Sequence, residues 1–296
     1  LIDIIVDPSG HVTSVVGGAP LNTARTITRL GVPASFLGGI SHDAFGGRIM
    51  RMLEDVGVRY ALGHRVDEPT TLAIAELDAH GAATYRFLLE ETSAGAVTPA
   101  QALAHVGDDC EILHVGTLGL VLQPLADAMR AVVEASPAHR IVMVDPNCRP
   151  AVMGSTTTFA DTFHAVLHRA DVVKVSGDDL AFMYPDVRAD DAARALQVAS
   201  EAVVLFTDGA EAVRVLAGDD EVVLDVPSVR VVDTVGAGDA FSGGFLAYWS
   251  RNGLGRGDLA NIDRVVEAAR FGIVVAGITC QRPGADPPHS REIEVG

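Results

Sequence analysis

The sequence predicts an α/β protein with a three-layer, doubly wound and mainly parallel sheet, and with a small β-sheet that acts as a lid. Two patterns carry this prediction. From residue 111 on, continuous apolar runs alternate with helical stretches, as in parallel sheets that are buried on both faces. Before that, residues 70–77 and 83–89 flank Asp78-Ala79-His80-Gly81, which is typical of an antiparallel hairpin.

The length of 296 residues and the hydrophobic share of 48% are enough for a large core. We expect one domain over residues 1–296. A discontinuous lid is expected at about residues 7–17 and 62–90, where the hairpin pattern interrupts the α/β pattern.

In the N-terminal part we expect three strands, over residues 1–6, 11–16 and 35–40. Asp3 interrupts the first of them, and a charged residue in a buried run lies at a strand end or serves a ligand. One helix is expected from about Asn22, and a second follows residues 41–43 and stops at Gly57.

In the C-terminal part the predicted parallel strands cover residues 112–115, 141–144, 172–175 and 203–206. The helices between and after them are expected over residues 124–135, 158–168, 177–183, 190–200 and 258–277. Shorter strands are predicted over residues 213–216, 221–226 and, leading into a glycine turn, 226–232. Ligands of such sheets bind beyond the carboxyl ends of the strands, so Asp145-Pro146-Asn147, residues 174–179 and Thr207-Asp208-Gly209 are expected to converge there.

Composition excludes several classes of partner. The formal net charge is −17 and no block of basic residues occurs, which argues against nucleic acid and anionic membranes. No apolar run reaches the roughly 18–20 residues of a membrane helix, and no signal-peptide pattern occurs. Three widely spaced cysteines favour neither disulfides nor zinc, and they suit a reducing cytoplasm. Because the chain opens in mid-strand without Met, we expect a short N-terminal piece to be missing from this numbering.

The rest of the chain is organised around residues 233–244, D-T-V-G-A-G-D-A-F-S-G-G. A strand, a glycine turn and a helix start direct free backbone N–H groups to one point, where the helix dipole adds positive charge. Gly236 and Gly238 allow close approach, so this turn predicts an anion site. Asp239 is explained either as a helix cap or as a base that faces a reacting hydroxyl.

The whole stretch resembles the C-terminal signature of the ribokinase-like (PfkB) carbohydrate kinases, D-T-x-G-A-G-D-x-F-x-x-G. The resemblance implies a ribokinase-like fold, with Asp239 as the catalytic base and Gly236, Ala237 and Gly238 as the anion hole. G-G-A-P-L-N at residues 17–22 resembles the N-terminal signature of fructokinase-like members. It implies that Asp3, Gly18 and Asn22 hold sugar hydroxyls, although an ordinary glycine turn with an Asn cap explains the same residues.

D-P-N-C-R-P at residues 145–150 resembles the fructokinase segment D-P-N-x-R-P, which implies Arg149 near the substrate or the transferred phosphate. A strand-end turn explains it too. Tyr85 of the segment Tyr85-Arg86-Phe87 in the lid hairpin is expected to reach the sugar or, equally, to belong to a plain cross-strand aromatic pair.

Residues 174–179, K-V-S-G-D-D, stand where the family has N-x-x-E. This implies phosphate contacts from Lys174 and Ser176 and a magnesium-bound water on Asp179, although helix capping explains Ser176 as well. T-D-G-A at residues 207–210 resembles the nucleotide loop, which implies ATP contacts from Thr207 and Gly209, with Gly238 at the phosphates.

The closing stretch, residues 277–285, resembles the loop with which ribokinase-like members bind a monovalent cation. The implied ligands are Asp233, Val235, Thr279 and Gly284, and oxygen donors of this kind suit potassium.

Taken together, the resemblance implies an ATP- and Mg²⁺-dependent kinase of a monosaccharide, fructose first, that closes its lid and dimerises through it. Kinases of 2-keto-3-deoxygluconate, ribose or a nucleoside stay open within the family. A sugar sensor without chemistry is the second alternative. A Rossmann dehydrogenase is the third, and the lack of G-x-G-x-x-G after the first strand argues against it.

Overall fold

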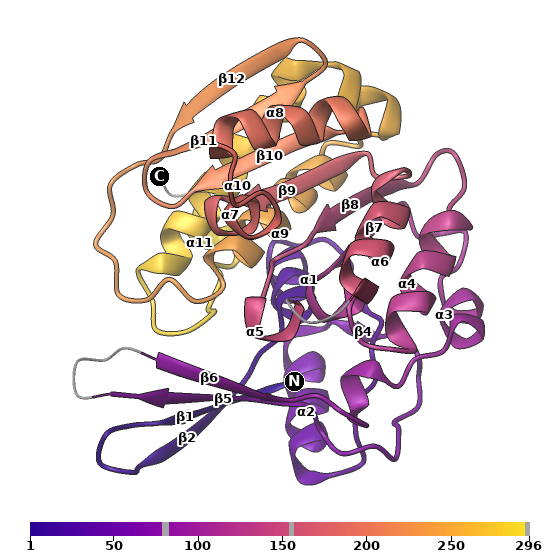
Figure 1. The fold of residues 1–296 in the computed structure, drawn as a ribbon, viewed down its shortest axis with the longest axis vertical. Helices are drawn as coiled ribbons and strands as arrows, with labels where there is room; N and C mark the ends of the chain where they lie inside the picture. Colours follow the sequence, from indigo (N-terminus) through magenta and orange to yellow (C-terminus); the bar gives the residue numbers. More distant parts are fainter. Residues whose placement is uncertain (79–82, 154–156, 294–296) are drawn as a thin grey trace.

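The computed structural model describes residues 1–78, 83–153 and 157–293, so most of the predicted hairpin turn lies outside the described residues (Figure 1). Within them, the central sheet has the strand order β12-β11-β10-β9-β8-β7 and the small sheet the order β2-β1-β5-β6. In the figure the small sheet stands below the body that carries the central sheet. This arrangement confirms the predicted α/β class with a separate small sheet.

Strands β7 to β10 are parallel, and β11 and β12 continue the sheet antiparallel. Their bounds are β7 Ile112–Gly116, β8 Ile141–Asp145, β9 Val172–Ser176, β10 Val203–Asp208, β11 Ala212–Ala217 and β12 Asp220–Asp225. The middle strands β8 and β9 are mainly apolar and almost wholly buried, because helices cover both of their faces.

Helices form the two outer layers. Phe241, Phe245 and Trp249 of α9 pack with α10 against one face of the sheet, and α1 packs on α9. Side chains of α4, α6, α7 and α8 form the core on the other face. The helices are α1 Ala19–Arg29, α2 Ala44–Val56, α3 Pro99–His105, α4 Leu125–Glu134, α5 Pro150–Met153, α6 Thr157–Leu167, α7 Gly177–Met183, α8 Ala189–Ser200, α9 Ala237–Arg251, α10 Ile262–Cys280 and α11 Ser290–Ile293, with 3₁₀ turns at Ser93–Gly95, Thr117–Leu120 and Arg256–Ala260.

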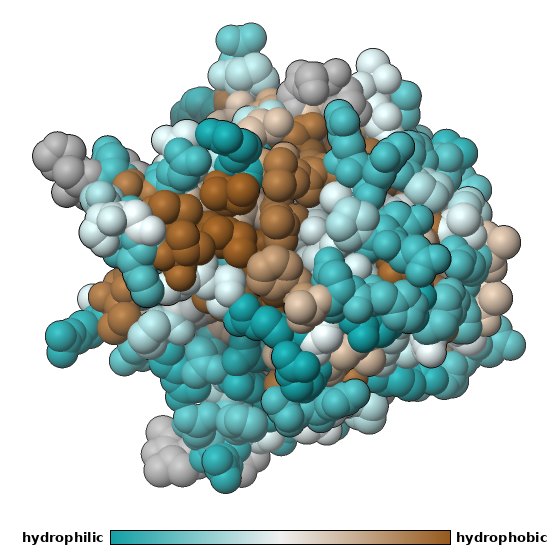
Figure 2. Space-filling model, turned by 90° about the horizontal axis from the view of Figure 1, so that it is seen from below, coloured by the Kyte–Doolittle hydropathy of each residue, from teal (hydrophilic) through white to brown (hydrophobic). Residues whose placement is uncertain are grey.

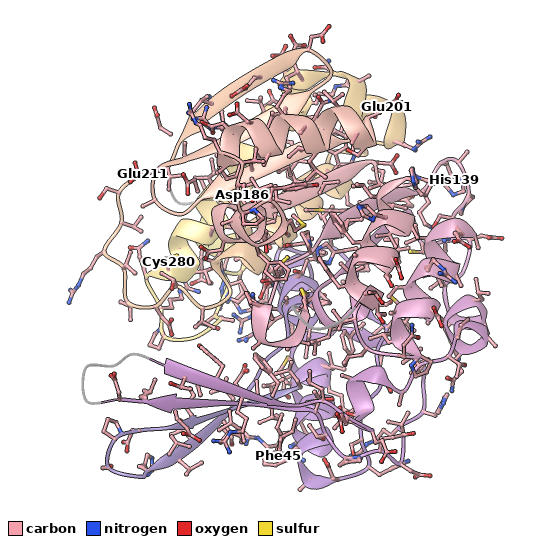
Figure 3. All side chains as sticks on the ribbon, in the orientation of Figure 1. Phe45, His139, Asp186, Glu201, Glu211 and Cys280 are labelled. Carbon is pink, nitrogen blue, oxygen red and sulfur yellow. The ribbon has the colours of Figure 1, made fainter. Side chains whose placement is uncertain are left out.

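The small sheet contains β1, which the predicted lid range left out. Its strands are β1 Ile2–Val6, β2 Val12–Val16, β5 Leu72–Leu77 and β6 Ala83–Leu88. One face packs at one end on α2, and the labelled Phe45 lies in the first turn of this helix (Figure 3). Asp3 lies on the opposite face, because the side chains of a strand alternate between the two faces.

Four local predictions are wrong. Residues 226–232 form no strand: Pro227 has no N–H to donate to a ladder, and Val231 and Val232 are 57% and 54% exposed. The third N-terminal strand is shorter than expected and consists of β3 Ser35–Phe36, which pairs with β4 Arg59–Tyr60.

Helix α1 starts three residues earlier than predicted, at Ala19, because proline is tolerated in the first helical turn. The last long helix starts later than predicted, at Ile262, after the 3₁₀ turn at Arg256–Ala260. Among the described residues, no helix has the length and apolar character that a membrane crossing requires.

Candidate active site

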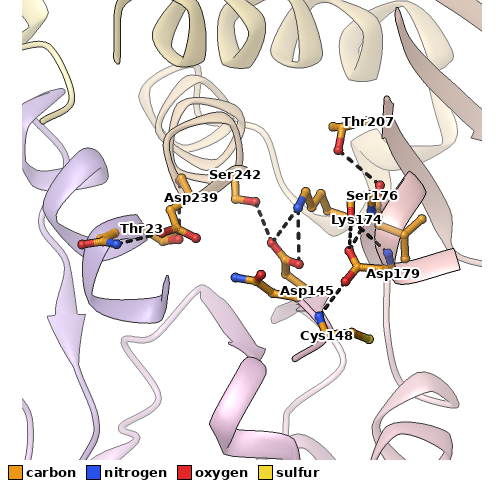
Figure 4. Close-up of polar contacts among 12 residues, drawn as sticks. Thr23, Asp145, Cys148, Lys174, Ser176, Asp179, Thr207, Asp239 and Ser242 are labelled. Carbon is orange, nitrogen blue, oxygen red and sulfur yellow. Dashed lines mark hydrogen bonds and ion pairs between the residues drawn. The ribbon is translucent and has the colours of Figure 1, made fainter. Parts of the chain in front are cut away.

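The carboxyl ends of β8, β9 and β10 meet the first turn of α9, and the predicted polar residues converge there (Figure 4). Register explains part of this convergence: Ser176 of β9 lies directly opposite Thr207 of β10. Asp145 ends β8, and Ser242 of α9 donates a hydrogen bond to its Oδ2 at 3.4 Å. Segments almost 100 residues apart in the chain therefore share one site.

Asp239 is buried in the first turn of α9, with an exposed fraction of 7%. The side-chain amide of Asn22 donates to its Oδ2 at 2.8 Å, so α1 holds the carboxylate in place. Burial raises the pKa of Asp239 to about 6, and the Asn22 hydrogen bond opposes this shift. The group is thus a carboxylate at neutral pH and becomes a carboxylic acid only slightly below it.

The turn before α9 has the backbone of an anion site. Gly236 has φ +76° and precedes the helix, and Ala237, Gly238 and Asp239 form its first turn. A β-carbon on Gly236 would come within 2.4 Å of the Ala285 side chain, so a larger residue would have to displace the closing loop. The free N–H groups of a first helical turn and the helix dipole favour an anion at this place.

Lys174 is buried beside this turn, 4% exposed. Its ammonium lies 3.3 Å from Asp145 Oδ2. A β-carbon on Gly238 would lie 3.1 Å from Lys174 Nζ, so the ammonium is next to the glycine turn. Burial disfavours the charge, but the carboxylates of Asp145, Asp179 and Asp239 outweigh it and raise the pKa of Lys174.

Asp179 is engaged in a capping box at the start of α7. Its Oδ2 accepts hydrogen bonds from the backbone N–H of Ser176 at 2.8 Å and from the Ser176 hydroxyl at 2.6 Å. Its Oδ1 accepts from the Cys148 N–H at 2.6 Å. Within the described ranges, no three acidic, His or Cys side chains are grouped to hold a metal. The described side chains therefore do not form a magnesium site by themselves, and a contact of Asp179 with a metal-bound water stays a prediction.

The small sheet brings Asp3 toward the same site. The Asp3 carboxylate passes so close to Gly17 that a β-carbon there would lie 1.9 Å from Oδ2. Burial raises the pKa of Asp3, and the charge of Arg149 opposes the shift. The charge of Arg149 lowers the pKa of Asp145 and of Asp239 as well, while its guanidinium donates hydrogen bonds to Asn147 Oδ1 at 2.6 Å and to the Cys148 carbonyl at 3.0 Å. Gly18, with φ +116°, precedes α1 and so places Asn22 in its first turn.

Tyr85 is 56% exposed on β6 and shares the Asp3 face of the small sheet. Its ring stacks on Phe87 of the same strand, with centroids 6.2 Å apart, so the expected cross-strand pair is wrong. A hollow of about 520 Å³ lies between this strand and α5.

The predicted nucleotide residues lie farther along the strand ends. The Thr207 hydroxyl donates to the Val175 carbonyl at 3.3 Å. Gly209 has φ +55° and open space on its β-carbon side, so the loop after β10 leaves room for a ligand.

The predicted cation residues come from the loop before α9 and from the end of α10 with the loop that follows it, and the structure joins these segments. Asp233 accepts from the N–H of Gly284 at 2.8 Å and of Val235 at 3.0 Å. Thr279 is buried one residue before Cys280, whose carbonyl accepts from the N–H of Asp233 at 3.2 Å. Asp233 is thus held by backbone amides, and its oxygens and the nearby loop carbonyls have the chemistry that a monovalent cation needs.

Sequence reasoning placed Asp145 at this edge without giving it a role, and it missed Ser242. Ser242 follows Asp239 by three residues on α9, and this spacing places both on one face of the helix. The ion pair of Lys174 with Asp145 joins neighbouring strands, and only the strand order shows it.

Comparison with known proteins agrees with this geometry. The model of the pfkB family carbohydrate kinases matches residues 4–292. A fructokinase of Rhizobium leguminosarum bv. trifolii is 34% identical over 78% of this chain and 70% of its own length. Fructokinase-1 of Oryza sativa subsp. japonica is 30% identical over 94% of this chain and 86% of its own.

Two solved structures share the fold at full length. A fructokinase of Xylella fastidiosa with bound ATP superposes with a TM-score of 0.87 at 25% identity, covering 100% of this chain and 95% of its own. A Vibrio cholerae fructokinase bound to fructose, ADP and calcium gives 0.82 at 25% identity, covering 96% and 91%.

Proposed function

The chain belongs to the pfkB family of carbohydrate kinases, and on this premise we propose that it transfers the γ-phosphoryl group of ATP to a hydroxyl of fructose. One observation carries the proposal: the buried Asp239 carboxylate, held by Asn22 at the mouth of the glycine turn. Fructose is favoured over the other sugars because the curated relatives reported above are fructokinases. Membership of a kinase family also overturns the dehydrogenase alternative.

Asp239 would act as the general base. The sugar oxygen attacks the γ-phosphorus, the new O–P bond forms as the bond to the β-phosphate oxygen breaks, and the hydroxyl proton passes to the carboxylate. ADP leaves with the electrons of the broken bond. Phosphoryl transfer needs mainly positioning and charge neutralisation, which the N–H groups of Gly236 to Gly238 would supply to the transferred group.

The sugar would be held between the small sheet and α1. Asp3 would offer an acceptor and Asn22 a donor to the sugar hydroxyls, and Gly18 sets the start of α1. Arg149 would neutralise charge near the transferred group, and Tyr85 would close over the sugar when the lid, residues 7–17 and 62–90, moves.

ATP would lie along the strand ends, with Lys174 and Ser176 at its phosphates and Thr207 and Gly209 toward the base. Magnesium would arrive with the nucleotide phosphates, because Mg²⁺ commonly binds through one or two carboxylates and substrate oxygens. The loops that hold Asp233 would take a potassium ion.

The outer face of the small sheet supports a homodimer through the lid. Figure 2 shows apolar side chains gathered in one patch over this sheet. Strand register places Val12 opposite Val6 and Leu88 opposite Leu72 on that face, and Val12 and Leu88 are 56% and 46% exposed. Val12→Glu should therefore yield monomers by sedimentation, and an unchanged oligomer would exclude this interface.

The function is tested by a panel of acceptors (fructose, glucose, ribose, 2-keto-3-deoxygluconate and adenosine) with ATP in an assay that couples ADP release. We expect fructose to give the highest kcat/KM. Preference for another acceptor would reassign the substrate. Tight sugar binding without ADP release would support the sensor alternative.

A further inference from the structure

Asp145 has no role in the transfer described above, yet it is buried at the centre of the site with an exposed fraction of 3%. Its contacts are long: Lys174 Nζ lies 3.3 Å from Oδ2 and 3.5 Å from Oδ1, and the Ser242 hydroxyl lies 3.4 Å from Oδ2. Charge-assisted hydrogen bonds are usually about 2.7–2.9 Å long. The Lys174 ammonium is therefore held loosely, with donors that an incoming phosphate can use.

Two negative groups compete for this ammonium. Asp145 lies on one side of it, and the charge of Asp239 acts on it from the first turn of α9. A lysine that moved onto Asp239 would stabilise the carboxylate form of the base and weaken it as a proton acceptor. It would also leave the glycine turn, where its charge is useful for phosphate.

We propose that Asp145 is a positioning residue of the kinase, which keeps the Lys174 ammonium at the glycine turn and away from Asp239. This inference rests on the proposed function, because it assigns the ammonium to the transferred phosphoryl group. The charged and polar groups that face Asp239 are Asn22 of α1, Asp145 of β8, Lys174 of β9 and Arg149 of the segment that follows β8.

The three charged groups shift Asp239 in known directions. The negative charge of Asp145 raises the pKa of Asp239, whereas the positive charges of Lys174 and Arg149 lower it, after burial as the largest cause. In the profile of kcat against pH, the acid limb is the range in which kcat falls as Asp239 becomes protonated. Removing Asp145 and removing Lys174 must therefore move this limb in opposite directions along the pH axis. Loss of structure alone would not produce opposite signs.

The test measures kcat for fructose phosphorylation against pH in two variants. In Asp145→Asn we expect kcat at pH 8 to fall about tenfold or more, because the ammonium leaves the phosphate. The acid limb should move about half a pH unit or more to lower pH, because Asp239 loses a negative neighbour and gains a closer positive one. In Lys174→Met the acid limb should move to higher pH.

A double variant shows whether Asp145 acts through Lys174. If it does, Asp145→Asn should change kcat at pH 8 by no more than about twofold once Lys174 is Met, because the group that it positions is gone. A further tenfold loss in that background would overturn the inference. The double variant removes both partners of the Lys174–Asp145 ion pair, so neither of them is left buried without the other. It therefore still provides the test if Asp145→Asn alone fails to fold.

Asp171→Asn is the matched control, because Asp171 is another buried, ion-paired aspartate, at the opposite end of the sheet. In Asp171→Asn the acid limb of kcat should lie at the same pH as in the wild type. If the limb also stays unchanged in Asp145→Asn and Lys174→Met, Asp145 has no positioning role. If the wild type shows no turnover, the proposed function fails. The pKa of the Asp239 carboxyl can then be measured by ¹³C NMR in the ligand-free protein. This measurement still decides whether Asp145 and Lys174 shift that pKa in opposite directions.

Discussion

Asp145 and Asp171 are buried, ion-paired aspartates at opposite ends of the central sheet, and their partners hold them very differently. Asp171 precedes β9 and accepts from Arg256 Nε at 2.6 Å, from Arg169 Nη1 at 2.8 Å and from the backbone N–H of Val142 at 2.8 Å. Asp145 ends β8, and its contacts with Lys174 and Ser242 are 3.3–3.5 Å long.

This difference in contact length distinguishes the ion pair of Asp171, which is structural, from that of Asp145, whose lysine is available to a ligand. Short bonds to two guanidinium groups and an amide satisfy the Asp171 carboxylate, and they join segments 85 residues apart. The longer contacts at Asp145 leave the ammonium of Lys174 able to bind a further anion. On the function proposed above, the carboxyl end of the sheet would carry charges that respond to ligands, whereas the bonds at the amino end fix the fold.

Replacement of the proton acceptor at the carboxyl end should have the largest effect. Asp239→Asn keeps the shape of the side chain but cannot accept the proton of the sugar hydroxyl. General-base catalysis typically contributes about 10²- to 10⁴-fold, so we expect kcat to fall by at least that order. Steady-state kinetics with fructose and ATP measure it, and turnover at the wild-type rate would remove Asp239 from the mechanism.

At the amino end the same substitution should affect stability instead of rate. Asp171→Asn removes the charge that Arg169 and Arg256 share, and breaking a fully buried pair costs about 3–5 kcal/mol. Because Arg256 is 46% exposed, we expect a smaller loss of unfolding free energy, about 2–3 kcal/mol, in urea denaturation. The kcat of the folded variant should equal that of the wild type, and a large loss of kcat would remove the contrast between the two ends.

Stability against pH provides a third test, because burial makes Asp239 costly to ionise. Its pKa is about 6 in the folded protein against an ordinary value of 3.8, so the folded state binds an extra proton between these values. The contribution of this group to stability is fully present below about pH 4 and is lost as the pH rises through about 6. Asp239→Asn has no such group, so at pH 8 it should be more stable than the ligand-free wild type, by about 1–3 kcal/mol. Melting curves at pH 5 and pH 8 measure this, and a variant that is less stable at pH 8 would contradict the buried charge.

Local patterns predicted most of the main body and its site. The apolar runs placed the four parallel strands within two residues, Gly57 marked the end of α2, and the topology rule brought Asp145, Lys174 and Thr207 to one edge. These features depend on short stretches of sequence or on rules that all such sheets obey. Asp239 and Asn22 were chosen separately from two motifs, and the structure places them in contact.

The features that sequence reasoning did not give depend on long-range pairing. An apolar run such as residues 2–6 does not reveal which sheet it joins, so β1 was left out of the predicted lid range. Residues 226–232 have the composition of a strand but no partner strand beside them in the described sheet. The bonds of Asp171 with Arg256 likewise follow from the packing of the whole chain.

Replacement of Asn22 should have the smallest of these effects, and it tests how a neighbouring side chain at the carboxyl end of the sheet sets the pKa of Asp239. Its amide is a hydrogen-bond donor to Asp239 and lowers the pKa of that carboxyl, so Asn22→Ala should move the acid limb of kcat to higher pH. The KM for fructose should also rise, by about tenfold, because the hydrogen bond proposed between Asn22 and the sugar would be lost. Thr23→Val is the matched control, since the Thr23 hydroxyl contacts the backbone carbonyl of Asp239 at 3.4 Å and not its carboxylate. An acid limb that moves equally in both variants would mean that α1 acts on Asp239 through packing, and the contrast with the tightly bonded Asp171 would then lose its electrostatic basis.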